Sequence, residues 1–572
     1  MKRYLQFTAL LALAAALSSC GGTDTDDPGK TSGLAVPENL SVRELTSSYV
    51  TIQWDPVEGA GSYKWKVSEG ASEVYSGNVG KRNVSVTELK AGTAYIFSVC
   101  AVSASATSPF SSINFTTEGS SEPAAVDGQC IDQPLKLELA GSPVLGSGGL
   151  IKVFTDNGSE VDRIDLADLA TVSVRENGCF IPKQQIGADS KFNSFMDAIP
   201  SAKRYRIEHY TPLRIKGNTL EIKLHSGVLE FGKSYYVTVD ESVAGKAVGR
   251  GEWNFTVKSK PEGTTLRVNP DGKADFCTVQ GALSYASTLA KSEEVTIEVA
   301  SGTYQEMLFL REKDNVTIKG ASRSGTVISY PNNESYCSGN GSSVTSRPGL
   351  GAGVGKAGGR GLALVESCDN LRLENITIEN SFGEQKGQAE TIYFNSSGKL
   401  TVESCNLLSW QDTFLTKGQV WVHNSLVAGH VDFIWGYPEV CLFEDCEIRS
   451  RAAGYIVQAR VNNAADKGFV FLNCTLTEES GVKDGSVYLA RSGGDSSKWD
   501  NVTYVNCKMS SAIAPAGWFS SPAPNPAAPS ADTGWKEFGT TGASTAQRST
   551  QGRLLTAEEA ASFSSKQAVL GW

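Results

Sequence analysis

The sequence predicts an all-β protein in which a right-handed parallel β-helix follows two small β-sandwich domains. Of the 572 residues, 40% are hydrophobic, 20% are charged and 58 are glycine, which is the composition of a globular, turn-rich chain. The first half contains short segments that alternate apolar and polar residues between Gly, Pro and Asn turns. The second half contains a recurring motif, which is typical of a solenoid.

Composition and motifs disfavour several functional classes. The formal charge is −10, from 52 basic and 62 acidic side chains, which argues against a dedicated nucleic-acid binder. Only four histidines are present, and HExxH, CxxC and GxSxG motifs are absent from the sequence. Most metalloproteases, thioredoxin-like enzymes and serine α/β-hydrolases are therefore disfavoured, and a histidine-based zinc site has little room.

The N-terminus is typical of an export signal. Two basic residues precede an apolar run from Ala9 to Leu17, which is too short to span a bilayer. The run leads into Cys20 through a sequence that resembles a bacterial lipobox, which implies cleavage before Cys20 and lipidation of its thiol and new amine. An ordinary signal peptide with a chance cysteine is the alternative. We expect residues 1–20 to be the signal peptide, residues 21–36 to be a flexible tether, and the protein to be lipid-anchored at the outer membrane or cell surface.

Residues 37–118 predict the first antiparallel sandwich. Three segments carry the period-two alternation: Val50–Trp54, Tyr63–Val67 and Tyr95–Val102. Trp54, Leu89 and Tyr95 are placed as in a fibronectin type III domain, which this stretch resembles throughout its length. The resemblance implies a spacer, and carbohydrate binding is the alternative.

Residues 124–259 form a second β-rich region, which resembles a bacterial Ig-like module. Its clearest predicted strands are Leu220–Leu224, Ser234–Val239 and Trp253–Val257. Cys130 and Cys179 both lie here and are candidates for a disulfide, although spacing alone does not establish the pairing. Neither small domain shows a catalytic constellation.

From residue 262 to residue 572 the pattern becomes a repeat, in which a small polar residue sits between apolar residues. The polar positions are Asn375, Ser404, Asn424, Asp445, Asn473 and Asn506, at steps of 29, 20, 21, 28 and 33 residues. A minimum step near 20 with loop-length additions predicts a right-handed parallel β-helix. We expect the polar residues to form a ladder at a bend with left-handed backbone. Helical spacing over residues 277–290 predicts a cap on the N-terminal end of the solenoid.

The position after each polar residue predicts a stack inside the β-helix. Four coils place a cysteine there: Cys405, Cys446, Cys474 and Cys507. We expect these to behave as small apolar side chains. Disulfides within the stack are the competing interpretation, which Ile376 and Ser425 at the same position disfavour.

Two aspartates share one phase of the repeat. Asp412 lies seven residues after Cys405, and Asp432 lies seven residues after Ser425. Their backbones should therefore be one rung apart, about 5 Å. Two carboxylates this close titrate as a coupled pair, and their largely apolar neighbours should raise one pKa and hold a proton on one member.

A carboxylate pair at this spacing suits two chemistries. A retaining glycosidase places its acids about 5–5.5 Å apart, whereas an aspartyl esterase uses one acid as nucleophile and one as proton donor, with further donors for an oxyanion. Gln411 adjoins Asp412, and Gln388 lies about one coil earlier, so two uncharged amides could converge on an oxyanion. Arg491 follows a predicted strand and could keep Asp432 ionised.

At this point a family resemblance becomes specific: residues 262–572 resemble the pectin methylesterases, a β-helix family of carbohydrate esterases. The matching stretches occur in order: Asp271-Gly272, Phe276–Leu283, Gly302–Glu306, Gln388–Thr391, Gln411–Phe414 and Val431–Gly436. The resemblance implies that Asp432 is the nucleophile and that Asp412 protonates departing methanol and then activates water. It further implies that Gln388 and Gln411 stabilise the oxyanion, that Arg491 orients Asp432, and that no metal or organic cofactor is needed.

The chain also departs from this family. Arg491 is followed by Ser-Gly-Gly rather than the usual Pro and Trp, and Trp499 arrives only after a short insertion. Trp435 stands where Phe is more usual. Four aromatic residues are candidates for stacking on sugar rings, with core packing as the alternative: Trp435, Trp499, Tyr437 and Tyr455. The Gly-rich stretch Gly349–Gly361 contains a GxGxxG match, which lacks the strand-to-helix context of a nucleotide site and instead suggests a mobile loop beside the substrate groove.

We therefore expect a monomeric, lipid-anchored esterase that releases methanol from methyl-esterified galacturonan in pectin. The alternatives are a β-helix glycosidase or polysaccharide lyase and a non-catalytic glycan-binding lipoprotein. The two glutamines disfavour the glycosidase, and no acidic cluster with calcium-site character supports a lyase. The presence of both acids, both amides and the arginine disfavours a decayed site.

Overall fold

The computed structural model describes residues 34–117 and 128–572, apart from short gaps at 46–48, 87–88, 91, 175–179, 184, 188–189, 338–342, 355–357, 384–386 and 544. The expected signal peptide, Cys20 and most of the tether lie outside the described residues. Within the described part of the chain, no helix is long and apolar enough to cross a membrane. The chain divides into two compact units, and the second contains residues 118–572.

The first unit is a sandwich of two antiparallel sheets, as predicted. One sheet has three strands, β1 (Ser41–Leu45), β2 (Val50–Gln53) and β5 (Asn83–Val86). The other has the order β4 (Ser72–Val79), β3 (Ser62–Glu69), β6 (Ala94–Val102) and β7 (Ser111–Thr116). Trp54, Leu89 and Tyr95 are all buried between the sheets. The alternation read from the sequence is therefore the inward face of this sandwich.

The second unit begins with the second β domain, whose longest sheet has the order β10 (Glu160–Asp165), β9 (Leu150–Thr155), β17 (Ser234–Val239) and β18 (Asn254–Thr256). A second sheet joins β15 (Leu213–Lys216), β16 (Thr219–Ile222) and β8 (Leu135–Glu138). Two hairpins complete it, β11 (Val172–Val174) with β12 (Phe180–Pro182) and β13 (Met196–Ser201) with β14 (Arg204–His209), together with the short helices η1 (Leu166–Thr171) and α1 (Glu241–Ala244). The three strands predicted from the sequence are present: β17 has the predicted limits, β18 is one residue shorter at each end, and β16 begins one residue earlier and ends two residues earlier.

The candidate disulfide between Cys130 and Cys179 is not formed. Cys130 is a free thiol, and its sulfur contacts the carbonyl oxygen of Ala274 at 3.2 Å, in the β-helix. Cys179 lies outside the described residues. The sequence spacing could not anticipate that Cys130 faces another domain rather than its own.

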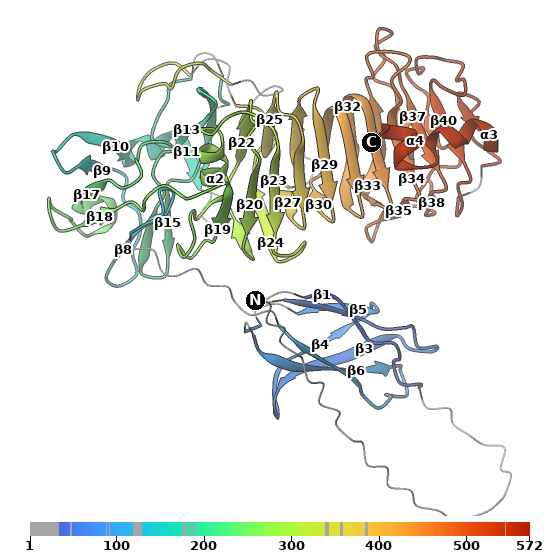
Figure 1. Ribbon diagram of the computed structural model, residues 1–572, viewed down its shortest axis with the longest axis horizontal. Helices are drawn as coiled ribbons and strands as arrows, with labels where there is room; N and C mark the ends of the chain where they lie inside the picture. The colour runs from blue at the N-terminus through green and yellow to red at the C-terminus, as the bar shows by residue number, and fades with distance from the viewer. Residues whose placement is uncertain are drawn as a thin grey trace, which may run out of the picture. The chain divides into compact units, whose positions relative to one another are not determined.

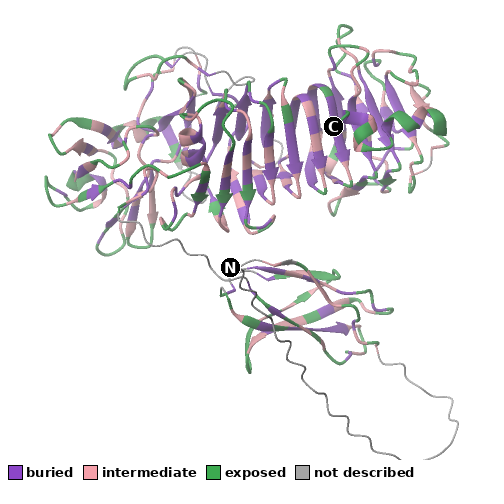
Figure 2. Ribbon diagram, in the orientation of Figure 1, coloured by how far each residue is buried: buried purple, intermediate pink, exposed green. Residues whose placement is uncertain are grey.

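The rest of the second unit is a parallel β-helix, in which successive coils pair in register (Figure 1). Its first coils use β19 (Thr265–Val268), β20 (Val295–Val299), β21 (Gly302–Tyr304), β22 (Leu308–Arg311), β23 (Val316–Gly320), β24 (Thr326–Tyr330), β25 (Ala363–Glu366), β26 (Leu371–Glu374), β27 (Thr377–Asn380), β28 (Ile392–Asn395), β29 (Lys399–Glu403) and β30 (Asn406–Leu408). Its later coils use β31 (Phe414–His423), β32 (Leu426–Glu444), β33 (Glu447–Ala459), β34 (Gly468–Leu472), β35 (Thr475–Glu478), β36 (Val487–Arg491), β37 (Val502–Val505), β38 (Lys508–Met509), β39 (Trp518–Phe519), β40 (Trp535–Phe538) and β41 (Gly552–Leu554). Most of these strands are buried (Figure 2), because one face of each fills the solenoid interior.

The predicted polar ladder is present at one bend of the β-helix. All six ladder residues have positive φ angles, between 46° for Asn424 and 56° for Asn473. Asn and Asp tolerate this left-handed backbone better than other residues with a Cβ. The side chains also bond between coils, since Asn424 Nδ2 donates to Ser404 Oγ at 2.9 Å. The ladder therefore turns the chain at the same place on each coil.

The cysteine stack is also present, as free thiols. Cys405, Cys446, Cys474 and Cys507 are at most 2% exposed. Each sulfur contacts a main-chain carbonyl oxygen of the preceding coil, for example Cys474 Sγ with Phe443 O at 3.3 Å. The prediction of stacked thiols rather than disulfides is confirmed.

Helices cover parts of the β-helix surface. Helix α2 (Val279–Ala286), shorter than the predicted 277–290, packs on β19, β20 and β22 and also on β13 of the second β domain. Thr278 caps it, accepting a hydrogen bond from the main-chain N–H of Gly281 at 2.9 Å. Near the C-terminus, α3 (Ala557–Ala560), η3 (Ala561–Phe563) and α4 (Lys566–Leu570) bury apolar side chains against the outer faces of β32, β34 and β37.

Candidate active site

The two aspartates lie on consecutive coils, as their phase predicts. Phe414 pairs with Ile434 in the parallel register of β31 and β32, and the same offset places Asp412 opposite Asp432. The main-chain N–H of Asp412 donates to Val431 O at 3.1 Å. Both acids are nearly buried, at 6% and 5% exposed, so they meet in a largely desolvated setting.

The backbone conformation of both aspartates departs from a regular strand and so sets the direction of their carboxylates. Asp412 has a φ of 64° and Asp432 a φ of 49°, outside the normal strand region. The register between β32 and β33 shifts on either side of Asp432, which marks a β-bulge. Bulges and left-handed residues concentrate at functional sites because they re-aim a side chain out of the regular alternation. Gly436 belongs to the same feature: its φ is 129°, and a Cβ there would lie 2.3 Å from Thr416 O.

Asp432 is held by a guanidinium and an amide. Arg491 Nε donates to Asp432 Oδ1 at 2.7 Å, and Arg491 Nη2 donates to Oδ2, which completes a two-point pair. Gln458, on β33, donates from Nε2 to Asp432 Oδ2 at 2.9 Å. This two-point pairing fixes the orientation of the Asp432 carboxylate. Gln458 was missed from the sequence because it lies 26 residues beyond Asp432, with no motif to mark it.

Asp412 belongs to a second group of charges that sequence reasoning also missed. Arg360 Nη2 donates to Asp412 Oδ2 at 3.1 Å, and Arg360 Nε donates to Glu390 Oε1 at 2.8 Å. Glu390 is fully buried. Burial and then the negative charge of Glu390 raise the pKa of Asp412 well above its ordinary value, although Arg360 opposes the shift. The raised pKa suits Asp412 to the role of a proton donor.

Gln388 and Gln411 lie next to this pair on adjoining coils. The main-chain N–H of Ala389, which follows Gln388, donates to Gln411 O at 3.1 Å. Both glutamines are half-buried, so their side chains are at the border between protein and solvent. The sequence prediction that they come from neighbouring coils is consistent with this placement.

Trp435 does not fit the predicted role in sugar stacking. It is 3% exposed and belongs to a buried row that also contains Phe309, Leu364, Tyr393 and Leu415. The guanidinium groups of two arginines lie over its ring, Arg360 at 5.2 Å and Arg460 at 5.0 Å. The indole therefore supports charged residues of the site from below, and core packing was the correct alternative.

Trp499 and Tyr437 have different surroundings. Trp499 is half-buried against the β-helix core, and its main chain pairs with Val461. Tyr437 is also half-buried, and Arg460 Nη1 donates to its hydroxyl at 3.3 Å. The Nζ atoms of Lys417 and Lys498 each lie 5.7 Å from the Tyr437 ring centre. Tyr437 thus carries a cationic rim beside the acids.

The aromatic group nearest Arg491 comes from other residues. The Arg491 guanidinium lies 4.8 Å from the ring centre of Tyr455. Tyr488 and Phe519 pack around Tyr455, with ring centres 5.9 and 4.9 Å away. Tyr455 is thus the ring that lies against the arginine, and Tyr488 and Phe519 support it.

The Gly-rich stretch contacts the second β domain. Phe192 N donates to Ala352 O at 2.9 Å, and Val354 N donates to Ser190 O at 3.0 Å. Residues 355–357 lie outside the described part of the chain. The stretch leads directly into Arg360, so its contribution to the site is this guanidinium.

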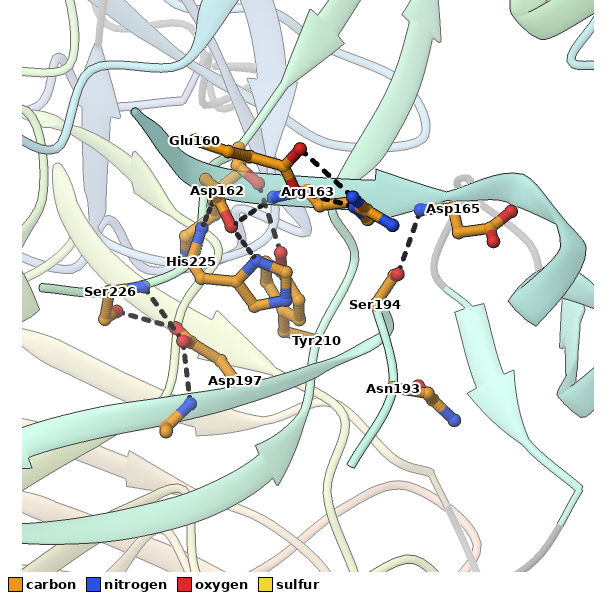
Figure 3. Close-up of polar contacts among 12 residues, drawn as sticks. Glu160, Asp162, Arg163, Asp165, Asn193, Ser194, Asp197, Tyr210, His225 and Ser226 are labelled. Atoms are coloured by element: carbon orange, nitrogen blue, oxygen red, sulfur yellow. Dashed lines mark hydrogen bonds and ion pairs between the residues drawn. The ribbon is translucent and has the colours of Figure 1, made fainter. Parts of the chain in front are cut away.

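The second β domain contains a buried polar cluster of its own (Figure 3). His225 Nδ1 lies 2.7 Å from Asp162 Oδ1, and burial opposes the imidazolium charge while this carboxylate raises the pKa of His225. The neighbouring Ser226 hydroxyl donates to Asp197 Oδ2 at 2.6 Å rather than to His225. The serine is therefore not placed for activation by the histidine, and these contacts stabilise the domain core.

Comparisons with known proteins agree with this geometry. The family model "Pectinesterase" matches residues 265–571, more than half of the chain, and the model "Fibronectin type III domain" matches residues 35–117. This chain belongs to the pectinesterase family. It is 31% identical over 256 residues to Pectinesterase 31 of Arabidopsis thaliana, covering 44% of this chain and 76% of that protein. It is 29% identical over 266 residues to the probable pectinesterase A of Aspergillus niger, covering 46% and 74%.

Solved structures similar to this chain include a pectin methylesterase from Aspergillus niger, which is 25% identical. The TM-score is 0.43, and the match covers 55% of this chain and 95% of that one.

Proposed function

We propose that this protein hydrolyses the methyl esters of galacturonosyl residues in pectin through an acyl-enzyme on Asp432. Family membership makes the chain a carboxylic ester hydrolase. The observation that supports the mechanism is that Asp432, held by Arg491, lies one coil from Asp412, whose pKa is raised by burial. An esterase of this kind uses one acid as the nucleophile and the other as the proton donor.

In the first half of the reaction, Asp432 attacks the ester carbonyl carbon. The negative charge that develops on the carbonyl oxygen is stabilised by the amide groups of Gln388 and Gln411. Collapse of this intermediate breaks the bond to the methoxy group, which leaves as methanol with the proton of Asp412. In the second half, Asp412 takes a proton from water, the hydroxide attacks the acyl carbon, and Asp432 leaves as a carboxylate.

The cations around Tyr437 support an acidic polymer as substrate. Lys417, Arg460 and Lys498 surround this ring and would attract the free carboxylates that accumulate as pectin is de-esterified. The same rim explains how a chain of net negative charge can hold an anionic product.

Methanol release from methyl-esterified pectin tests the proposal, with reducing ends and unsaturated products measured in the same samples. Methanol without chain cleavage is the expected result. Chain cleavage without methanol would mean that the aspartate pair performs glycosidic chemistry, and the roles given to Gln388 and Gln411 would be wrong.

We also propose that the protein is an exported, monomeric lipoprotein anchored through Cys20. The lipobox-like sequence before Cys20 supports the anchor. Metabolic labelling with a fatty acid should mark the wild-type chain and leave Cys20→Ala unlabelled; equal labelling of both would exclude this anchor.

A further inference from the structure

Two buried cysteines from different domains meet where the second β domain packs on the β-helix. Cys130 lies before β8 and is 1% exposed, and Cys277 lies before α2 and is 3% exposed. Their sulfur atoms and a carboxylate oxygen of Asp132 all lie within 4.8 Å of one another. Both cysteines are free thiols in the structure.

A buried lysine makes one of these sulfurs a good nucleophile. Lys258 Nζ lies 3.4 Å from Cys130 Sγ and donates to Gly272 O at 2.7 Å and to Ala274 O at 2.8 Å. The hydrogen bond from Cys277, and the charge of Lys258 with it, lower the pKa of Cys130. The thiolate is the form that attacks disulfides, and a nearby ammonium favours it.

The stacked cysteines of the β-helix provide the contrast. Burial raises the pKa of Cys474 well above its ordinary value, whereas the pKa of Cys130 is lowered. Within the described part of the chain, Cys130 is the cysteine whose sulfur contacts an ammonium group. The stacked cysteines also lie close to one another, but a neighbouring ammonium group distinguishes the Cys130 sulfur from theirs.

A metal site at the same place is disfavoured by two observations. Asp132 already accepts hydrogen bonds from Cys277 N at 2.9 Å and Thr278 N at 2.7 Å, and it also accepts from the Thr278 hydroxyl. Lys258 adds a positive charge at the sulfur that would bind the cation. These features suit two thiols better than a metal and its ligands.

We propose that Cys130 and Cys277 form a disulfide that ties the second β domain to the first coil of the β-helix. The oxidant is a small disulfide such as oxidised glutathione. Cys130 thiolate attacks one of its sulfurs and releases a thiolate, which accepts the proton of Cys277. Cys277 then displaces the second small thiol, so two protein thiols are oxidised and one small disulfide is reduced to two thiols.

A cavity of about 690 Å³ between the second β domain and the β-helix brings a small disulfide as far as Cys277, which lines it together with Lys223 and Tyr304. Cys130 does not line this cavity, but its sulfur lies within 4.8 Å of the Cys277 sulfur. The inference does not rest on esterase activity, because this cavity and the aspartate pair are lined by different residues.

The test is peptide mapping of the full chain, solubilised in detergent and equilibrated with oxidised and reduced glutathione. After denaturation and alkylation without reductant, we expect a Cys130–Cys277 linked peptide, while Cys474 and Cys507 are alkylated. Cys130→Ser should remove the linked peptide, and Cys474→Ser, the matched control, should retain it. Full alkylation of both cysteines, a link from Cys130 to Cys179, or bound zinc that Cys130→Ser releases would each overturn the proposal.

Thermal unfolding provides a second readout. A cross-link between distant parts of the chain restricts the unfolded state, so reductant should lower the unfolding midpoint of the wild type by about 5 °C. The midpoint of Cys130→Ser should not respond to reductant, and methanol release should be equal in both redox states. A wild-type midpoint that is equal with and without reductant would overturn the tethering.

Discussion

At the residue scale, Arg360 connects two buried acids. It pairs with Glu390 at 2.8 Å and with Asp412 at 3.1 Å. Burial raises the pKa of both acids, and the charge of Glu390 raises the pKa of Asp412 further. This setting suits Asp412 to the role of the proton donor. Arg360, which the sequence did not reveal, thus positions Asp412, which the sequence did reveal.

Replacing Glu390 should move the pH profile. Glu390→Gln removes a negative charge beside Asp412 and leaves Arg360 in place, so the pKa of Asp412 falls. Because catalysis needs Asp412 protonated, the alkaline limb of kcat/KM should shift to lower pH by about one pH unit. Methanol release measured across pH checks this. Glu366→Gln, which alters another buried Glu–Arg pair, is the control and should leave the profile unchanged; an unmoved limb in Glu390→Gln would contradict the role of Glu390.

Replacing the nucleophile should stop turnover. Asp432→Asn keeps the shape of the side chain but removes its nucleophilic charge, and kcat should fall at least about a thousand-fold. Asp445→Asn changes an exposed aspartate with the same left-handed backbone, and its activity should match the wild type. Circular dichroism should show both variants folded. Undiminished hydrolysis by Asp432→Asn would remove Asp432 from the mechanism.

The residues foreseen from sequence differ from those missed in a physical way. Asp412, Asp432, Gln388 and Gln411 could be predicted because the solenoid converts a regular spacing into proximity. Arg360 comes from a long loop, 52 residues before Asp412, where spacing carries no such information. For Trp435 the sequence left sugar stacking and core packing open, and its 3% exposure favours core packing.

At the scale of the element, the ladder bend is the feature that repeats most faithfully. Coil lengths vary, yet Asn473 and Asn506 keep φ angles of 56° and 53°. Strands β31, β32 and β33 are longer than the short segments expected, since pairing continues past the bulge at Asp432. The motif spacing therefore predicted the coils, whereas the strand limits depend on pairing that only the assembled coils provide.

The bend offers a direct test of backbone strain. Asn473 is exposed, so Asn473→Val changes little packing but places a β-branched residue in the left-handed region. We expect the free energy of unfolding to fall by about 1–2 kcal/mol. Asn473→Gly, which adopts this backbone freely, is the control and should stay within about 0.5 kcal/mol of the wild type. Urea unfolding measures both, and equal losses would point to the side-chain contacts of Asn473 instead.

At the scale of the whole molecule, the second β domain and the β-helix share buried contacts. Arg206, from β14, is fully buried and donates to the carbonyl oxygens of Leu308, Leu362 and Gly359 at 2.8, 2.9 and 3.1 Å. Ile207 of the same strand packs in one cluster with Cys337 and Val354 of the β-helix loops. A role for this domain in supporting the catalytic coils could not be predicted from its own alternating pattern, because the partners lie far along the chain.

Truncation should show that the two accessory domains contribute differently to the stability of the β-helix. A chain that begins at residue 118 loses only the first unit and should keep the unfolding midpoint and kcat of the wild type on soluble pectin. A chain that begins at residue 260 lacks Arg206, so the carbonyl oxygens that accept its hydrogen bonds lose their donor. It also exposes apolar side chains that the second β domain covers. This chain should therefore aggregate or unfold at lower temperature. Soluble yield and calorimetry compare the two, and equal midpoints would contradict a shared core.

The coils that carry the two acids are also the shortest, since ladder steps of 20 and 21 residues enclose them. The strands and bends take up all the residues of such a coil, so neither of these two coils contributes a long loop that could cover the acids. We therefore expect a long polysaccharide to reach the two aspartates from the side, at any point along its length, without threading in from a chain end.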